Sequence, residues 1–485
     1  MRVIVRSLAG AGMFVAAAYG MTGCATNPVT GQRQLSLVSE GQEIQMGRDG
    51  AAQVEAQIGL VEDAALQQYV QRIGRSLAAT SERPNLPWNF GVVNDPTPNA
   101  FALPGGFIYV TRGLLPLMEN EAELATVIGH EIGHVTAKHS VTQMSNAQLA
   151  QIGLGLGSIL APGVADRVGG LAGAGLQLLF LKYGRDDERQ ADELGFNYAL
   201  ANRYDVREMA DVFVALGRTG EAAGQSPIPT WAASHPSSGE RVETARARAA
   251  ALPANTGALN SNEAEFNTRL DNMIYGENPR EGFFRNGVFL HPDLKFQIAF
   301  PQGWQTQNTT QAVFAGSPQQ DAVMQLTLAQ GTAAQAAQQF ASQQGLQVLQ
   351  SSQQNINGNP GAVVAFQATT QDGAVRGLVG FVTYGGSTYQ VLGYSTAQRY
   401  GAYERTFANV IGSFNRLTDA AALNVQPRRL DTIRLDRAMT LSAFNQRYPS
   451  TIPMAELAII NQVEGASSTL PSGSYAKRVT GGPPS

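Results

Sequence analysis

Cysteine is almost absent from this chain of 485 residues, which contains only Cys24. An internal disulfide is therefore excluded. Charged residues are also scarce, at 15%, and the net charge is −4 without a basic run, so a nucleic-acid partner is not expected. We find no repeat array with a period of about 30 to 50 residues. The length allows two or three domains, each with its own core.

The N-terminus has the pattern of an export signal. Arg2 and Arg6 precede a largely apolar stretch, residues 8–20, which is too short to span a bilayer comfortably. Small residues and then Cys24 follow. We predict a signal peptide over residues 1–23. An uncleaved membrane anchor is the alternative.

The residues around Cys24 suggest what the single cysteine does. Met21-Thr22-Gly23-Cys24 resembles a bacterial lipobox, which implies that Cys24 carries a lipid and becomes the new N-terminus. Ala25 follows in place of the aspartate that favours inner-membrane retention, so this resemblance implies attachment to the outer membrane on its periplasmic side. Residues 24–40 are polar and turn-rich, and we predict that they form a lipidated tether.

Changes of pattern divide the rest of the chain. Helical periodicity and two short strand-like runs, residues 90–93 and 106–111, predict a mainly α domain with a small β-sheet. Alternating runs interleaved with helical stretches predict an α+β domain further on. We predict the following segments: a first domain at 41–252, a linker at 253–280, the α+β domain at 281–420 and a small module at 430–480.

One helix of the first domain carries a metal-binding pattern. Asn120 and Glu123 predict a capped helix start. His130 and His134 are four residues apart, so both imidazoles project from one face and can bind one Zn²⁺. Glu131 is placed to act as general base on an activated water. The chain has only five histidines, which makes a chance match improbable.

A second motif completes a known pattern. HExxH followed by ExxxD resembles the zinc metallopeptidase family of HtpX and the CAAX prenyl endopeptidases. That resemblance implies a zincin-type fold with Glu188 as third zinc ligand and Asp192 behind a ligand histidine. Charge patterning alone would favour a solvated helix residue for Glu188.

Further stretches resemble the periplasmic BepA-like branch of that family. These stretches are Asn27-Pro28-Val29-Thr30-Gly31, residues 99–106, and His235-Pro236 with Arg241. The resemblance implies that Asn99, Ala100 and Phe101 bind substrate, and that His235 lies at the active site as an oxyanion stabiliser or as a plug over the zinc. It also implies that Arg241 orients the loop or binds substrate carbonyls.

Two further histidines and one apolar segment have no assigned catalytic role. His139 and His291 are expected to be structural histidines. Residues 152–181 are apolar and glycine-rich. They predict either a mobile cover beside the active site or plain core helices.

The two later segments resemble known modules. Phe300-Pro301-Gln302-Gly303-Trp304, with the order of strands and helices, resembles PsbP-like domains, although a generic interaction domain is equally consistent. Residues 430–480 resemble a LysM module, which implies possible contact with peptidoglycan.

Together these patterns predict a zinc endopeptidase of the bacterial envelope that hydrolyses envelope proteins in quality control. The alternative is a chaperone-like or peptidoglycan-binding lipoprotein that uses the zinc fold as a scaffold.

Overall fold

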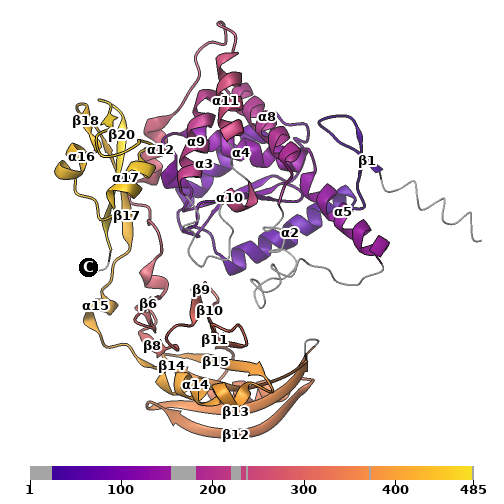
Figure 1. Cartoon of the computed structure of the whole chain (residues 1–485), viewed down its shortest axis with the longest axis vertical. Coiled ribbons are helices and arrows are strands. Elements are labelled where there is room, and N and C mark those ends of the chain that lie inside the picture. The colour runs from indigo at the N-terminus through magenta and orange to yellow at the C-terminus, as the bar shows by residue number, and fades with distance from the viewer. Residues whose placement is uncertain (1–23, 155–181, 220–230, 236–238, 371–372, 483–485) are drawn as a thin grey trace, which may run out of the picture. The chain divides into compact units, whose positions relative to one another are not determined.

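The computed structural model describes residues 24–154, 182–219, 231–235, 239–370 and 373–482 (Figure 1). The chain divides into two compact units. The first comprises residues 1–224, 228–272 and 431–478, and the second residues 225–227, 273–430 and 479–485. Most of the segment predicted to form a mobile cover, residues 155–181, lies outside the described residues.

The first unit is mainly helical and contains a small sheet. Its strands and 3-10 turns are β1 (Cys24–Thr26), β2 (Arg33–Leu35), β3 (Asn89–Val93), β4 (Ala100–Leu103), β5 (Phe107–Thr111), η1 (Leu115–Leu117) and η3 (Val206–Glu208). Its helices as far as residue 272 are α2 (Glu40–Gln57), α3 (Ala64–Ala78), α4 (Glu121–Thr136), α5 (His139–Leu154), α8 (Arg185–Ala201), α9 (Met209–Arg218), α10 (Trp231–Ser234), α11 (Gly239–Ala250) and α12 (Glu263–Leu270).

Helix α4 is the centre of this unit, and every one of its residues is buried. It begins where the sequence predicts, because the Asn120 side chain accepts a hydrogen bond of 3.1 Å from the Glu123 backbone amide. In a capping box the Glu123 carboxylate would accept from the backbone amide of Asn120. Here it accepts instead from the amide of the preceding residue, Glu119, at 3.0 Å.

Helices α4 and α8 approach each other unusually closely, and glycine makes this possible. A Cβ atom added at Gly195 would lie 2.7 Å from the His130 backbone nitrogen. One added at Gly129 would lie 3.0 Å from the Gly195 backbone. Because neither position carries a side chain, the two backbones touch, and residues of α8 come within reach of the α4 histidines.

The small sheet has the strand order β3-β5-β4, with β3 parallel and β4 antiparallel to β5. The predicted strands at 90–93 and 106–111 correspond to β3 and β5. Strand β4 was not predicted, because its four residues follow a Pro/Asn-rich loop. It forms one edge of the sheet, with the side chains of Ala100 and Phe101 buried.

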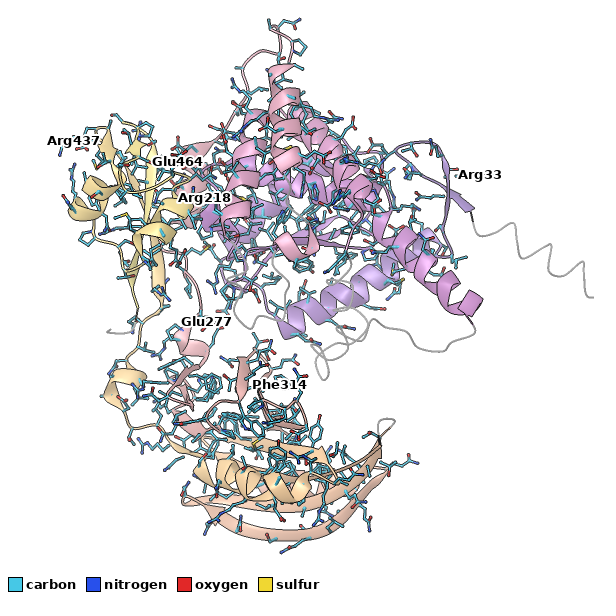
Figure 2. The ribbon with its side chains drawn as sticks, viewed as in Figure 1. Arg33, Arg218, Glu277, Phe314, Arg437 and Glu464 are labelled. Carbon is cyan, nitrogen blue, oxygen red and sulfur yellow. The ribbon has the colours of Figure 1, made fainter. Side chains whose placement is uncertain are left out.

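The C-terminal segment 431–478 packs on the first unit although it follows the second in sequence. It contains β18 (Met439–Thr440), α16 (Leu441–Arg447), α17 (Met454–Ile460) and β19 (Thr469–Leu470), flanked by β17 (Arg428–Arg434) and β20 (Tyr475–Gly481). Buried Lys477 donates to the carbonyls of Pro116 and Met118, directly before α4, at 2.9 and 2.5 Å. Arg437 and Glu464 are exposed on this segment (Figure 2).

The second unit is rich in β-structure. Its larger sheet has the order β12-β13-β14-β15-β11-β10-β9 and its smaller one β16-β8-β7-β6. The strands are β6 (Phe283–Arg285), β7 (Val288–His291), β8 (Phe296–Ala299), β9 (Gln305–Asn308), β10 (Ala312–Gly316), β11 (Ala322–Ala329), β12 (Leu346–Ile356), β13 (Asn359–Thr370), β14 (Gly373–Tyr384), β15 (Ser387–Thr396) and β16 (Asn415–Arg416). The helical elements are η4 (Pro279–Glu281), α13 (Ala333–Ala341), α14 (Tyr400–Ser413) and α15 (Ala420–Leu423).

Helices cover both faces of the larger sheet. On β14, Val379 and Phe381 belong to the core under α13, whereas Val382 belongs to the core under α14. Successive residues of a strand point to opposite faces, so α13 and α14 lie on opposite sides. This is the mixed helix and sheet architecture that the alternating pattern predicted.

No helix within the described part of the chain is both long enough and apolar enough to cross a membrane.

Candidate active site

Four buried side chains from three helical elements converge on one point. His130 and His134 come from α4, Glu188 from α8 and His235 from the residue after α10. One nitrogen or oxygen of each lies within 4.8 Å of the corresponding atoms of the others. Four metal-ligating groups so close together, all buried, form a candidate metal centre.

The distances within this cluster fit a metal ion. The Nε2 atoms of His130 and His134 lie 3.0 Å apart. The Glu188 carboxylate lies 3.7 Å from the first and 3.5 Å from the second. Ligands bound tetrahedrally at ~2.0–2.1 Å from one Zn²⁺ are separated by about 3.4 Å. The two imidazoles and the carboxylate are therefore spaced as ligands of a single ion.

The protonation of these groups also suits a metal. Burial lowers the pKa of His134 well below its usual value, which keeps the imidazole neutral and able to coordinate. Burial alone would raise the pKa of Glu188, but the neighbouring histidines, His235 foremost, outweigh it and hold this pKa far below its usual range. Glu188 is thus a carboxylate at any physiological pH.

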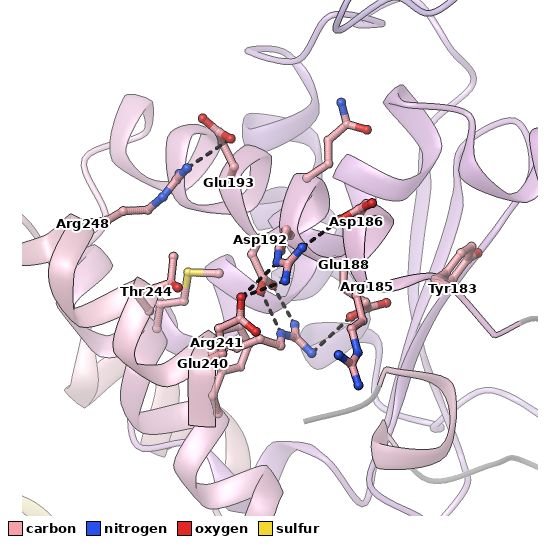
Figure 3. Close-up of a pocket in the computed structure, with 15 residues that line it drawn as sticks. Tyr183, Arg185, Asp186, Glu188, Asp192, Glu193, Glu240, Arg241, Thr244 and Arg248 are labelled. Carbon is pink, nitrogen blue, oxygen red and sulfur yellow. Dashed lines mark hydrogen bonds and ion pairs between the residues drawn. The ribbon is translucent and has the colours of Figure 1, made fainter. Parts of the chain in front are cut away.

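Asp192 and Arg241 support the ligands from behind. Asp192 Oδ1 lies 2.8 Å from Nδ1 of His130, so the carboxylate orients the ring and leaves Nε2 facing the cluster. Arg241 donates to both oxygens of Asp192 at 2.8 and 2.6 Å and lies 3.1 Å from the Glu188 carboxylate. One buried guanidinium therefore positions both acidic residues, as Figure 3 shows.

Glu131 is unusual because its buried carboxylate has no hydrogen-bond partner among the described residues. The Nε2 atom of His235 lies 3.4 Å from its Oε1. Burial raises the pKa of Glu131 to about 7, with His130 and Arg241 opposing this rise and Glu188 adding to it. A buried carboxyl group without a fixed partner, titrating near neutrality beside a metal cluster, is suited to act as a general base.

His235 occupies the fourth side of the cluster. Its Nδ1 lies 3.0 Å from Glu188 and 3.3 Å from Nε2 of His130. Trp231 stacks on the His235 ring at 4.3 Å, and its own backbone amide donates to the Pro98 carbonyl beside β4. The short α10 segment is thereby attached to the sheet edge next to the metal cluster.

The three residues predicted to bind substrate lie at that edge, but their side chains face inwards. Ala100 and Phe101 are buried, and Phe101 packs on Tyr109 at 5.6 Å. Asn99 is also buried, and its Oδ1 accepts from Ser234 at 3.4 Å. Any contact of Ala100 and Phe101 with substrate would therefore have to come from the backbone.

Three further residues adjoin the cluster. Tyr183 stacks on His134 at 3.9 Å. His139, interpreted as structural, has its Nδ1 2.9 Å from Nδ1 of His134. Trp231 was not identified from the sequence. It precedes His235 by four residues, and this spacing could have indicated that the two rings share one face of a helix. No pattern in the sequence signals Tyr183. The other histidine interpreted as structural, His291, lies in the second unit.

A pocket of about 650 Å³ adjoins the cluster between α8, α9 and α11, and Glu188, Asp192 and Arg241 line it (Figure 3). The buried residues Met209 and Phe213 also line it, together with charged and uncharged side chains from α8 and α11.

Comparisons with known proteins agree with this geometry. Residues 64–249 match the sequence pattern of the family described as "Peptidase family M48". The beta-barrel assembly-enhancing protease of Yersinia pestis is 32% identical over 230 residues, which are 46% of this chain and 47% of that protein. The mitochondrial metalloendopeptidase OMA1 of Schizosaccharomyces pombe is 30% identical over 223 residues, 44% of this chain and 63% of that protein. The chain thus spans less than two thirds of the length of these relatives.

Part of the chain is also similar to a solved structure, cyanobacterial PsbP from Synechocystis sp. PCC 6803, with 15% identity and a TM-score of 0.23. This likeness covers 27% of this chain and 94% of that one, and at such a score it supports no assignment. The PsbP-like and LysM-like interpretations remain predictions. The family match and the site geometry agree for the first unit: residues 64–249 match peptidase family M48, and this metallopeptidase domain is similar to that of the beta-barrel assembly-enhancing proteases.

Proposed function

We propose that the chain is a zinc-dependent endopeptidase of the bacterial cell envelope that hydrolyses envelope proteins as part of their quality control. The observation that carries the proposal is the position of Glu131, buried beside His130, His134 and Glu188 and without a hydrogen-bond partner among the described residues. A scaffold that only used zinc for stability would have no need of a buried carboxylate without a hydrogen-bond partner there. The chaperone-like alternative is therefore disfavoured.

The mechanism assigns a role to each residue around the cluster. His130, His134 and Glu188 would hold Zn²⁺, which supplies a Lewis acid for the scissile carbonyl and lowers the pKa of water. Glu131 takes a proton from the attacking water and passes it to the leaving amine. Its pKa of about 7 suits both transfers near neutral pH.

The residues around Glu131 keep the ligands in place. Asp192 fixes the tautomer of His130, and Arg241 holds Asp192 and Glu188 at a constant separation. Substrate backbone would pair with the edge of β4 that faces away from β5, next to Pro98, where Trp231 now donates a hydrogen bond.

His235 has two candidate roles. As a donor it would stabilise the oxyanion formed from the attacked carbonyl. As a neutral imidazole it would occupy the open ligand position until substrate displaces the α10 segment. Its distances of 3.0 and 3.3 Å to Glu188 and His130 favour the second role, because the ring already stands among the ligands.

Glu131→Gln tests the proposal. It removes the base and no ligand, so zinc content should remain at one per chain while casein cleavage falls to background. A Glu131→Gln protein that cleaves casein at the wild-type rate would exclude the mechanism. Glu82→Gln is a control, because Glu82 contacts Tyr198 and none of the ligands.

The envelope location rests on Cys24, for which lipidation is proposed from the lipobox resemblance. Peptidoglycan contact through residues 430–480 is proposed on the LysM resemblance alone. Pull-down of the full chain with purified peptidoglycan tests it.

A further inference from the structure

The turn between α4 and α5 places a histidine behind one of the proposed metal ligands. On an unbroken helix, His139 would lie about 140° round the axis from His134, five residues before it. The helix instead ends at Thr136, and Lys138 has a left-handed backbone with φ at +60° before α5 begins at His139. This break brings the His139 ring back to His134, and the two Nδ1 atoms lie 2.9 Å apart.

Contacts on two sides hold the broken turn. Asn27, between β1 and β2, is buried and donates through Nδ2 to the Ala137 carbonyl at 3.2 Å. The ammonium group of Lys138 lies 3.7 Å from the Glu43 carboxylate of α2. A residue other than glycine is strained in a left-handed conformation, and such strain persists where neighbouring contacts fix it. These contacts therefore fix the turn that positions His139.

The contact between the two rings determines which nitrogen of each ring carries a hydrogen. Nε2 of His134 faces the cluster, 3.0 Å from Nε2 of His130. A neutral imidazole that binds a metal through Nε2 keeps its hydrogen on Nδ1, so His134 donates and Nδ1 of His139 accepts. His139 must then carry its own hydrogen on Nε2.

Gln190 of α8 provides the acceptor for that hydrogen. Its Oε1 lies 2.9 Å from Nε2 of His139. Asp187 is further from this nitrogen, at 3.6 Å, and its other carboxylate oxygen accepts from the Gly184 amide at 3.1 Å. A neutral amide thus ends the series of hydrogen bonds that begins at His134.

A stacking contact fixes the plane of the same ligand ring. Tyr183 stacks on His134 with the ring centroids 3.9 Å apart and the planes 25° from parallel. The Tyr183 hydroxyl lies 2.8 Å from that of Ser140, the residue after His139. The first residues of α5 therefore hold the His134 ring at its edge directly and at its face through Tyr183.

We propose that His139 and Gln190 are positioning residues for the zinc site. His139 keeps His134 in the tautomer and rotation that binding through Nε2 requires, and Gln190 does the same for His139. The inference rests on the proposed function, in which His134 is a zinc ligand. Removing the partner behind a ligand histidine weakens metal binding by about 10–100-fold. The two ligand histidines differ, because the charged Asp192 lies behind His130 and a neutral ring lies behind His134.

Zinc affinity of the full chain, measured by chelator competition, tests both contacts. His139→Phe keeps a ring in the space but removes the acceptor, so the affinity should fall about 10–100-fold. Gln190→Leu removes the outer hydrogen bond and should weaken zinc binding about two- to tenfold. Gln190→Glu supplies an acceptor again and should bind zinc at least as tightly as the wild type.

Asn146→Leu is the matched control. Asn146 is an exposed amide residue of α5 that lines a pocket of about 370 Å³ together with His139 and Gln190. The same change from an amide to leucine at this position should keep the wild-type zinc affinity.

A spectroscopic signature separates positioning from packing. The chain has only five histidines, so ¹⁵N-labelled histidine gives a simple spectrum of the zinc-loaded protein, and the signal missing in His139→Phe assigns that ring. We expect His139 to be neutral with its hydrogen on Nε2, and His134 to carry its hydrogen on Nδ1. A hydrogen on Nδ1 of His139 would overturn the proposal, because that nitrogen would then not accept from His134.

The affinities give a second way to refute it. Wild-type zinc affinity in His139→Phe, or a loss in Gln190→Glu as large as in Gln190→Leu, would overturn the proposal. The two Gln190 variants decide the question even where His139→Phe does not fold, because Gln190 is only half-buried. A wild type that shows the expected affinities but cleaves no casein would overturn the peptidase and leave this inference intact. A wild type that binds no zinc would overturn both.

Discussion

Replacing Gly195 by alanine should push α8 away from α4 and disturb the metal cluster. The added Cβ would lie 2.7 Å from the His130 nitrogen and 3.0 Å from its Cα, all backbone atoms that cannot rotate away. Ordinary contact begins at 3.4 Å, so the helices must separate by about 0.7 Å. Glu188 lies on α8, two turns before Gly195, and would move relative to His130.

The size of the effect follows from that displacement. Overpacking of this kind costs about 1–3 kcal/mol of unfolding free energy. A misplacement approaching 1 Å at a catalytic site lowers turnover by up to about a hundredfold. We therefore expect Gly195→Ala to bind zinc more weakly and to lower kcat on casein by roughly ten- to a hundredfold, with KM changed much less.

Gly41→Ala is the matched control. Gly41 lies in α2 with no atom within 4 Å of an added Cβ, so alanine there should leave kcat unchanged and raise stability by about 0.5–1 kcal/mol. Chemical denaturation, zinc titration and casein kinetics on both variants give the comparison. Wild-type turnover and zinc affinity in Gly195→Ala would refute the link between the helix contact and the site.

Three other predictions concern single side chains. Asp192→Asn should reduce zinc affinity or kcat by about 10–100-fold, measured by chelator competition, because the anionic partner of His130 is lost. His235→Ala should raise basal casein cleavage if the ring is a plug and lower kcat if it stabilises the oxyanion; no change in either would return it to a structural role. Burial lowers the pKa of His291 in the second unit to about 4, so its neutral form is favoured by folding. That contribution is present above pH 6.5 and lost as pH falls towards 4, and His291→Gln should flatten the acid dependence of hydrogen exchange in β7.

Local spacing explains what could be predicted from the sequence. The relative positions of His130, Glu131 and His134 depend only on helix geometry, and the Asn120 cap is equally local. The family resemblance is confirmed by the comparisons. The roles that it implied for Glu188, Asp192 and His235 remain proposals.

Long-range packing explains what could not be predicted. His235 lies 105 residues from His130 in sequence, and nothing local brings the two rings together. Lys477 follows the second unit in the sequence and yet binds the turn before α4. The order of segments along the chain does not indicate this contact. Polar, turn-rich composition predicted a tether over residues 24–40, and composition alone does not reveal that Asn27 binds the C-cap of α4.

Anomalous diffraction at the zinc edge, on crystals of the full-length protein grown with zinc, tests the central claim most directly. We predict one peak per chain, within ~2.0–2.2 Å of the Nε2 atoms of His130 and His134 and of a Glu188 oxygen. The Glu131 carboxylate should lie beside the ion without binding it. A peak at another set of side chains, or a zinc coordinated by Glu131 in place of Glu188, would contradict the proposed active site.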